Sequence, residues 1–230
     1  MSQDAIWHPS PNFGHRRGGA RPDLIVLHYT AMDSARAARD RLCDRPAEVS
    51  AHYLIGRCGT LWQLVAEADR AWHAGAGAWR GAGDVNSRSI GIEIDNDGAS
   101  PFAAAAMDRL EPLLTDLCAR WAIPPEGVIG HSDMAPGRKA DPGPRFDWRR
   151  LARAGLAIWP RAAGGVDADP AGIGGDLDAI GYPPTEAVAR LAAFRARFRP
   201  GASGPPDAVD AGLARDLAAR FGVDPARGGR

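Results

Sequence analysis

The chain has 230 residues, 45% of them hydrophobic, which is enough for one domain with a real core plus a small appendage. Its 28 basic and 28 acidic residues are balanced, which argues against a nucleic-acid-binding protein, since such proteins normally carry a basic excess. Three cysteines, Cys43, Cys58 and Cys118, form no CxxC pair, which argues against a disulfide framework and a thiolate zinc site.

The N-terminal segment has no basic stretch followed by an apolar run, so we expect no signal peptide. No stretch approaches the roughly 18 apolar residues that a membrane-spanning helix needs. We therefore expect a cytoplasmic protein. The alternative is the periplasm or cell envelope, if the natural start lies upstream.

Strand-like patterns dominate the first part of the chain. Residues 24–29 (LIVLHY) form an apolar, branched run that is typical of a buried strand. Residues 51–56 and 60–65 flank a turn and predict a hairpin. In residues 89–95 every second side chain is isoleucine, which predicts a strand with one buried face.

A helix is expected after these strands, with Ser100 and Pro101 at its N-terminus. Its apolar stripe comprises Met107, Leu110, Leu114, Leu117 and Trp121. Residues 127–131 predict a further short strand that runs into a loop rich in Pro and Gly. Because strands and helices alternate, we expect an α/β layer fold with a mixed central β-sheet flanked by helices.

Composition changes near residue 160. Residues 161–175 are rich in Gly, Ala, Asp and Pro and predict a linker between a domain of residues 1–160 and a small all-α domain of residues 176–230. In this tail Thr185 is expected to cap a helix. The apolar side chains of the two tail helices are Val188, Leu191, Phe194 and Phe198 in the first, and Leu213, Leu217 and Phe221 in the second. With residues 180–183 they predict a compact three-helix unit.

Two histidines stand at the ends of apolar strands. His28 closes the first strand, and His131 enters a stiff loop that also holds Asp133, Lys139 and Asp141. Taken alone, His28 is more simply a core histidine satisfied by one hydrogen bond, and a charged loop is usually a solvated one. Two neutral imidazoles plus one carboxylate, however, are a common catalytic zinc set that leaves a fourth position for water.

Glu93 is the other unusual residue, because it lies in a strand whose opposite face is apolar. A carboxylate there is costly unless it is paired, hydrogen-bonded or directed into a cleft. It therefore lies either on a solvated outer face or beside the metal, as a general base.

Five segments in this order resemble the N-acetylmuramoyl-L-alanine amidase family (Amidase_2) of zinc enzymes. They are LHYT (27–30), SAHYLI (50–55), AWHAG (71–75), NSRSIGIEI (86–94) and GHSDMAPGRKADPGP (130–144). The opening HPSPNF (8–13) and the closing FDW (146–148) match the family as well. The resemblance implies the fold shared by T7-type phage lysozymes and peptidoglycan recognition proteins.

The resemblance also implies roles for individual residues. Zinc would be held by His28, His131 and Asp141, with Glu93 as general base and Lys139 beside the developing oxyanion. The family cleaves the amide between the lactyl group of N-acetylmuramic acid and L-alanine of the peptidoglycan stem peptide.

Further positions in the matching motifs receive weaker assignments. His52 is expected to be a structural or second-shell residue, and Trp72 and His73 are expected to line the substrate cleft. Asn86 and Arg88 are expected to contact peptide carboxylates of the substrate.

The short spacing between His28 and His52, residues 29–51, indicates the shorter, AmiD-like branch of the family, which accepts anhydro and ordinary muropeptides. Residues 176–201 resemble the helical peptidoglycan-binding-like domain of that branch. The expected partners are therefore muropeptides or the sacculus. We also expect that removing residues 165–230 leaves activity on soluble muropeptides and weakens binding to sacculi.

Three alternatives stand beside this interpretation. A non-catalytic peptidoglycan recognition module would share the scaffold but typically lacks one zinc ligand. A phage endolysin usually has cysteine at the position of Asp141 and lacks this tail. A purely structural interaction protein would not need the complete metal set.

Overall fold

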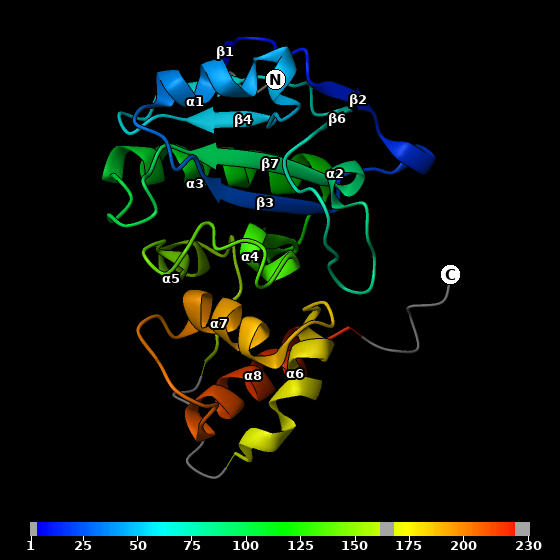
Figure 1. Cartoon of the computed structure of the whole chain (residues 1–230), viewed down its shortest axis with the longest axis vertical. Helices are drawn as coiled ribbons and strands as arrows, with labels where there is room; N and C mark the ends of the chain where they lie inside the picture. The colour runs from blue at the N-terminus through cyan, green and yellow to red at the C-terminus, as the bar shows by residue number, and fades with distance from the viewer. Residues whose placement is uncertain (1–3, 162–167, 224–230) are drawn as a thin grey trace.

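The computed structural model describes residues 4–161 and 168–223 of the chain. Its strands are β1 (Ile6–Trp7), β2 (Phe13–His15), β3 (Leu24–Tyr29), β4 (Tyr53–Ile55), β5 (Leu61–Gln63), β6 (Asp69–Ala71), β7 (Ser89–Ile94) and β8 (Val128–Gly130). Its α-helices are α1 (Ala35–Leu42), α2 (Val85–Arg88), α3 (Ala104–Trp121), α4 (His131–Met134), α5 (Trp148–Arg153), α6 (Ile173–Ile180), α7 (Ala187–Phe198) and α8 (Ala208–Phe221). Figure 1 shows the sheet in one half of the molecule and helices α6, α7 and α8 in the other.

The main sheet has six strands in the order β1-β5-β4-β7-β3-β8. Neighbouring strands are parallel except β4 and β5, which form an antiparallel pair and confirm the predicted hairpin. Strands β2 and β6 form a separate antiparallel pair. The mixed sheet predicted from the sequence is therefore confirmed. In its centre His28 of β3 lies directly opposite Glu93 of β7.

The two faces of the sheet differ as the alternation in β7 predicts. Ile90, Ile92 and Ile94 share one core with the apolar stripe of α3, which lies behind the sheet in Figure 1. Ser89, Gly91 and Glu93 alternate with them and so lie on the opposite face, which also carries His28. The polar positions of β7 are thus directed to the side on which the candidate ligands gather.

The predicted start of the long helix is wrong by a few residues. Helix α3 begins at Ala104, and Ser100 instead donates its hydroxyl to Asp97 Oδ2 over 2.8 Å. Ser100 therefore lies in a turn before the helix, whose N-cap is Ala103, and it does not cap the helix. The apolar stripe itself is confirmed, since Met107, Leu110, Leu114 and Leu117 are buried and Trp121 packs at the edge of the core.

The tail forms three packed helices, as predicted, with different boundaries. The N-cap of α7 is Glu186 rather than Thr185, and Val188 is 80% exposed rather than part of the core. Helix α6 begins at Ile173, inside the range predicted as linker, and residues 162–167 of that range lie outside the described residues. The division into domains at residues 160 and 176 stays a prediction.

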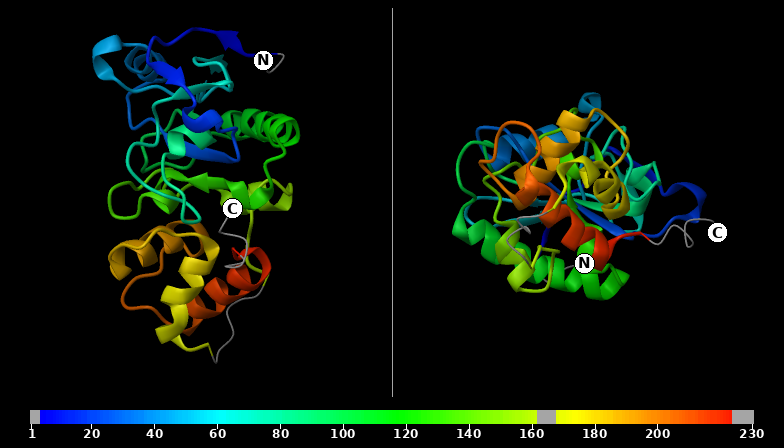
Figure 2. Two further views of the ribbon diagram at one scale, coloured as in Figure 1. Left: turned by 90° about the vertical axis from the view of Figure 1, so that its right-hand side faces the viewer. Right: turned by 90° about the horizontal axis from the view of Figure 1, so that it is seen from below.

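The tail helices share a hydrophobic core with the sheet. Val26 and Ile129 from the sheet pack in one cluster with Tyr182, Phe194 and Phe198 from the tail. In the left view of Figure 2, as in Figure 1, α6, α7 and α8 gather below the sheet, and α4 and α5 lie between β3 and α7. The tail is therefore a packing partner of the sheet layer and not a loosely attached appendage.

A buried ion pair joins these two parts of the chain. Arg197 of α7 donates to Asp133 Oδ2 of α4 over 2.6 Å and to the carbonyl of Val128 over 3.0 Å. The hydroxyl of Tyr182 donates to the other carboxylate oxygen of Asp133 over 2.8 Å. Because α4 begins at His131, the tail directly contacts the helix that carries one candidate ligand.

None of the helices within residues 4–161 and 168–223 combines the length and the apolar character needed to cross a bilayer.

Candidate metal centre and catalytic cleft

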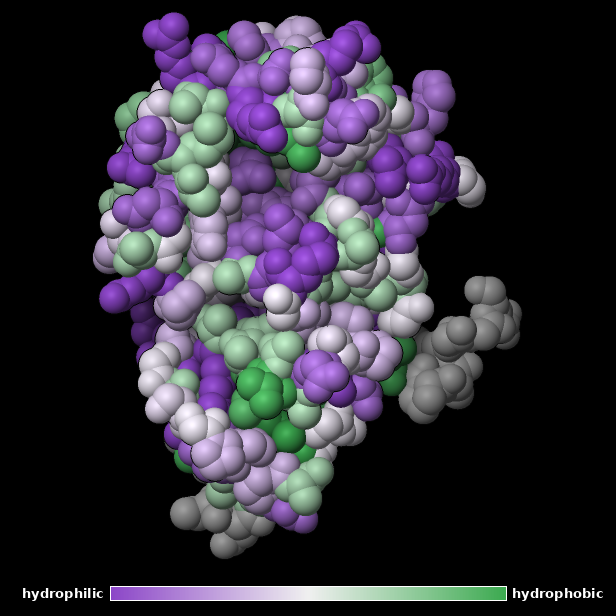
Figure 3. Space-filling view, viewed as in Figure 1, coloured by the Kyte–Doolittle hydropathy of each residue, from purple (hydrophilic) through white to green (hydrophobic). Residues whose placement is uncertain are grey.

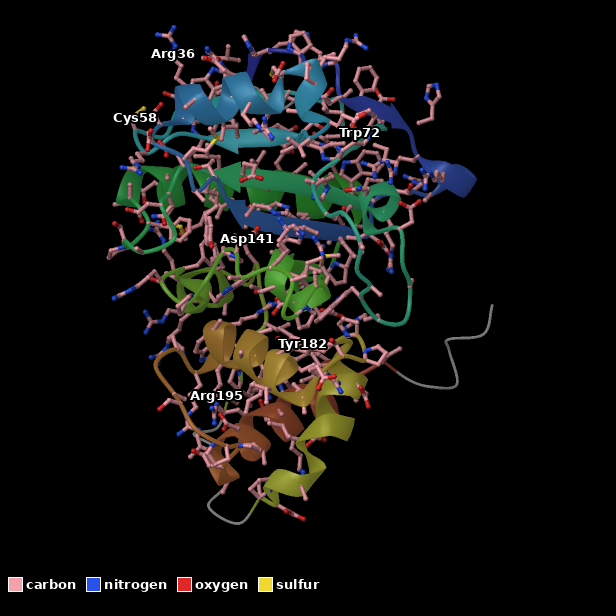
Figure 4. The ribbon with its side chains drawn as sticks, viewed as in Figure 1. Arg36, Cys58, Trp72, Asp141, Tyr182 and Arg195 are labelled. Atoms are coloured by element: carbon pink, nitrogen blue, oxygen red, sulfur yellow. The ribbon has the colours of Figure 1, made fainter. Side chains whose placement is uncertain are left out.

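A cleft of about 430 Å³ opens on the face of the sheet that carries His28 and Glu93. Its walls come from the ends of β3 and β7, from α4 and from the loops around residues 72 and 139. Figure 3 shows hydrophilic side chains gathered over this part of the molecule, and Figure 4 places Asp141 between β3 and α4.

The three predicted ligands lie together in this cleft. His28 and His131 each place Nδ1 close to Asp141 Oδ2, at 2.8 Å and 3.0 Å respectively. All three side chains are buried, and one ligand atom from each lies within 4.8 Å of the others. Strand ends supply the two histidines and the loop after α4 supplies the carboxylate, as the sequence predicted.

The hydrogen bonds of this group fit a bound cation. His131 Nε2 lies 2.9 Å from the carbonyl of Ala74, which can only accept, so in the neutral ring Nε2 carries the proton and Nδ1 keeps a lone pair. Burial lowers the pKa of His28 to about 4, which keeps its ring neutral near pH 7. His131 Nδ1, left as an acceptor, then faces the carboxylate oxygen of Asp141 at 3.0 Å, and a bound metal ion would relieve the repulsion between these two acceptors.

Glu93 lines the same cleft as the three candidate ligands. Within the described residues its Oε2 is buried and unpaired. Burial raises the pKa of the Glu93 carboxyl well above its usual range, the charge of Asp141 raises it further, and Lys139 partly opposes both effects. An unpaired buried carboxylate is costly for folding, which is the pattern expected of a group kept for chemistry.

The loop between α4 and Asp141 is fixed by Arg138, for which the sequence motifs predict no role. Arg138 donates to the carbonyl of Ala74 over 2.7 Å and also to the carbonyl of Ala76. Lys139, the next residue, is exposed and lines the cleft. Arg138 lies within the motif of residues 130–144, so the sequence draws attention to it. The motif does not show that the partner of Arg138 is the carbonyl of Ala74, 64 residues away.

His52 is fully buried and uses both ring nitrogens. Its Nδ1 accepts from the backbone N–H of Gly91 over 3.0 Å, and its Nε2 donates to the carbonyl of Asp69 over 3.1 Å. It does not line the cleft, and these contacts fit the structural role expected for it. Trp72 and His73 line the cleft as expected.

Asn86 and Arg88 do not line the cleft. Asn86 Oδ1 accepts from the backbone N–H groups of His73 and Ala74, at 3.0 and 2.8 Å. Arg88 forms a bidentate ion pair with Asp23. The expectation that Asn86 and Arg88 contact the substrate therefore has no support, because their polar atoms are engaged in holding the cleft wall and the strand end.

Comparison with known proteins identifies the family. Residues 18–144 match the family model described as N-acetylmuramoyl-L-alanine amidase. The N-acetylmuramoyl-L-alanine amidase AmiD of Escherichia coli is 38% identical in an alignment that covers 89% of this chain and 85% of AmiD. The 1,6-anhydro-N-acetylmuramyl-L-alanine amidase AmpD of Enterobacter cloacae is 33% identical, over 64% of this chain and 88% of AmpD.

Solved structures extend the likeness to the tail. E. coli AmiD, in complex with the substrate anhydro-N-acetylmuramic acid-L-Ala-D-gamma-Glu-L-Lys, superposes with a TM-score of 0.80 at 33% identity, covering 93% of this chain and 99% of AmiD. AmpDh3 of Pseudomonas aeruginosa gives a TM-score of 0.78 at 29% identity, covering 96% of this chain and 98% of that one. The family model spans more than half of the sequence and the AmiD match spans nearly all of it, so this chain belongs to the N-acetylmuramoyl-L-alanine amidase family.

Proposed function

We propose that this chain is a zinc-dependent amidase that hydrolyses the bond between the lactyl group of anhydro-N-acetylmuramic acid and L-alanine of the stem peptide. The amidase activity follows from the family. The observation that supports the metal and the mechanism is the convergence of His28, His131 and Asp141 beside the unpaired carboxylate of Glu93.

His28 Nδ1, His131 Nδ1 and one carboxylate oxygen of Asp141 would hold the zinc ion. This set of nitrogen and oxygen donors suits zinc. When bound, zinc would supply a Lewis acid that polarises the scissile carbonyl and promotes ionisation of water.

Glu93 is the general base in this proposal. Its free Oε2 accepts the proton of the attacking water, and the raised pKa of its carboxyl lets it keep that proton until the amine of L-alanine leaves. Because Glu93 lies opposite His28 on the neighbouring strand, the sheet fixes the base relative to the ligand.

Lys139 stabilises charge. Its side chain lines the cleft on the loop that carries Asp141, so its ammonium is placed to approach the negative charge that develops on the carbonyl oxygen. Among the described residues no carboxylate forms an ion pair with Lys139, which leaves the ammonium free for this role.

The substrate class is inferred from the relatives. E. coli AmiD was solved with anhydro-N-acetylmuramic acid-L-Ala-D-gamma-Glu-L-Lys and AmpDh3 with an anhydromuramic pentapeptide, and both likenesses extend over more than nine tenths of this chain. We therefore propose anhydro-muropeptides as substrates and peptidoglycan turnover or muropeptide recycling as the process. A cytoplasmic location is proposed with it, and cell fractionation tests that location.

The Glu93→Gln variant tests the mechanism. Glu93 is not a ligand, so zinc content should be unchanged while kcat falls by about 10²–10⁴-fold, the usual contribution of a general base. The matched control is Glu186→Gln, which changes an exposed carboxylate at the start of α7 and should leave kcat unchanged. A variant that lost zinc together with activity would show that Glu93 has been given the wrong role.

A further inference from the structure

A half-buried imidazole lies directly behind the candidate ligand His28. His73 Nδ1 is 3.1 Å from His28 Nε2, the ring nitrogen directed away from Asp141. On its other side, His73 Nε2 is 3.2 Å from the hydroxyl oxygen of Ser89. The planes of the two rings meet at 80°. The mechanism described above gives neither His73 nor Ser89 a role.

The direction of each hydrogen bond in this chain can be assigned from its far end. The carbonyl of Val85 can only accept, so the hydroxyl of Ser89, 2.5 Å away, donates its proton there. The oxygen of Ser89 is then left as an acceptor for His73, and Nε2 of His73 must carry a proton. A neutral His73 consequently has a bare Nδ1, which accepts from Nε2–H of His28.

We infer that His73 and Ser89 are positioning residues that fix the tautomer of His28, keeping its proton on Nε2 and its Nδ1 lone pair directed at the metal position. This inference rests on the proposed zinc site. It assigns His28 the same arrangement that the carbonyl of Ala74 imposes on His131. A metal-ligating histidine commonly has such a partner on its second nitrogen, and losing the partner typically weakens metal binding by about 10–100-fold.

The strand beneath His73 is shaped to accommodate the ring. A Cβ atom added to Gly91 would lie 2.4 Å from Cγ of His73, so only glycine at this position of β7 leaves room. Asn86 holds the backbone of His73 and Ala74 through its two amide contacts. His28 has the ring of His73 as its partner, and His131 has the carbonyl of Ala74. Both partners therefore depend on the same short segment, residues 73–74.

Two substitutions of His73 separate hydrogen bonding from packing. In His73→Asn the amide oxygen can occupy the place of Nδ1 and accept from His28, whereas His73→Leu fills a similar volume without an acceptor. We measure zinc affinity without substrate, by competition with a chelator, and confirm folding by thermal unfolding. The leucine variant should bind zinc about 10–100-fold more weakly than the wild type, and the asparagine variant should recover most of that loss.

Ring-nitrogen NMR gives a readout independent of any variant. Long-range proton–nitrogen spectra of the wild-type protein should show His73 and His28 each protonated on Nε2 and bare on Nδ1. A proton on Nδ1 of His73, or equal zinc affinity in the leucine and asparagine variants, would overturn the inference. Failure of the wild type to bind zinc would instead overturn the proposed function, and the spectrum of the metal-free protein would still decide the two tautomers.

Discussion

The Arg197→Met substitution removes one half of the buried ion pair between α7 and α4. Arg197 and Asp133 are only 3% and 1% exposed, and the guanidinium also stacks on Trp148 with its carbon 4.0 Å from the ring centre. Methionine keeps much of the apolar stem and removes the charge. Asp133 would retain the hydroxyl of Tyr182 and the N–H of Gly130, at 2.8 Å each, but no cation.

The magnitude follows from burial. Removing one partner of a buried ion pair leaves an uncompensated charge and costs roughly 3–5 kcal/mol, although the intact pair itself contributes little net stability. Because Asp133 also accepts from the residue before His131, a displaced carboxylate should disturb the ligand as well. Zinc affinity should therefore fall together with the free energy of unfolding.

Urea unfolding of Arg197→Met against wild type, followed by zinc titration, measures both effects. The matched control is Arg36→Met, whose side chain is exposed at the other end of the molecule (Figure 4) and, among the described residues, pairs only with the exposed Asp40. Such surface pairs contribute little, so the control should unfold close to wild type. If Arg197→Met were no less stable than the control, the pair would not be what anchors the tail to the metal loop.

Three further perturbations test the roles of the tail, of His52 and of Lys139. Removing residues 165–230 should abolish zinc binding and activity on soluble muropeptides, because Asp133 loses its partners and the shared core becomes exposed. This outcome is contrary to the expectation from sequence, and full activity of the shortened chain would contradict it. His52 has a pKa lowered by burial to about 3, so the unfolded chain, with a pKa near 6.5, binds the proton first, and stability is lost as pH falls from 6.5 towards 3. Between pH 7.5 and 5 protonation linked to His52 should lower the free energy of unfolding by about 2 kcal/mol, so the loss measured by urea unfolding should be smaller by that amount in His52→Gln, in which His28 still contributes. Lys139→Ala should lower kcat by about 10²–10³-fold with little change in zinc content, measured as initial rates on a defined muropeptide, and an unchanged kcat would remove the oxyanion role.

Patterns within one segment predicted the strands well. The branched run of β3 and the alternation in β7 match the observed strands, because burial on one or both faces leaves a direct mark on residue choice. The helix starts were predicted less well. Ser100 is a good cap by residue type, yet it lies in a turn closed by Asp97, before the N-cap Ala103, and residue type alone does not reveal this turn.

The candidate site likewise combines residues that the sequence predicted with contacts that it did not. The family motifs predicted the grouping of His28, His131 and Asp141. The contacts that hold the helix of His131 were not predictable from spacing, because the partners are far apart in sequence. Tyr182 and Arg197 reach Asp133 of this helix across 49 and 64 residues. Asn86 was assigned to substrate because it is polar and lies near the base, whereas its amide holds the backbone that orients both histidines.

The most direct test of the central claim is mass analysis of the products formed from a defined anhydro-muropeptide, with zinc content measured on the same protein sample. We expect one zinc per chain and two products, the anhydro-muramic acid sugar and an intact stem peptide beginning with L-alanine. Cleavage and zinc should both be lost on chelation and return together. Binding of the muropeptide without cleavage, cleavage at another bond, or full activity in zinc-free protein would contradict it.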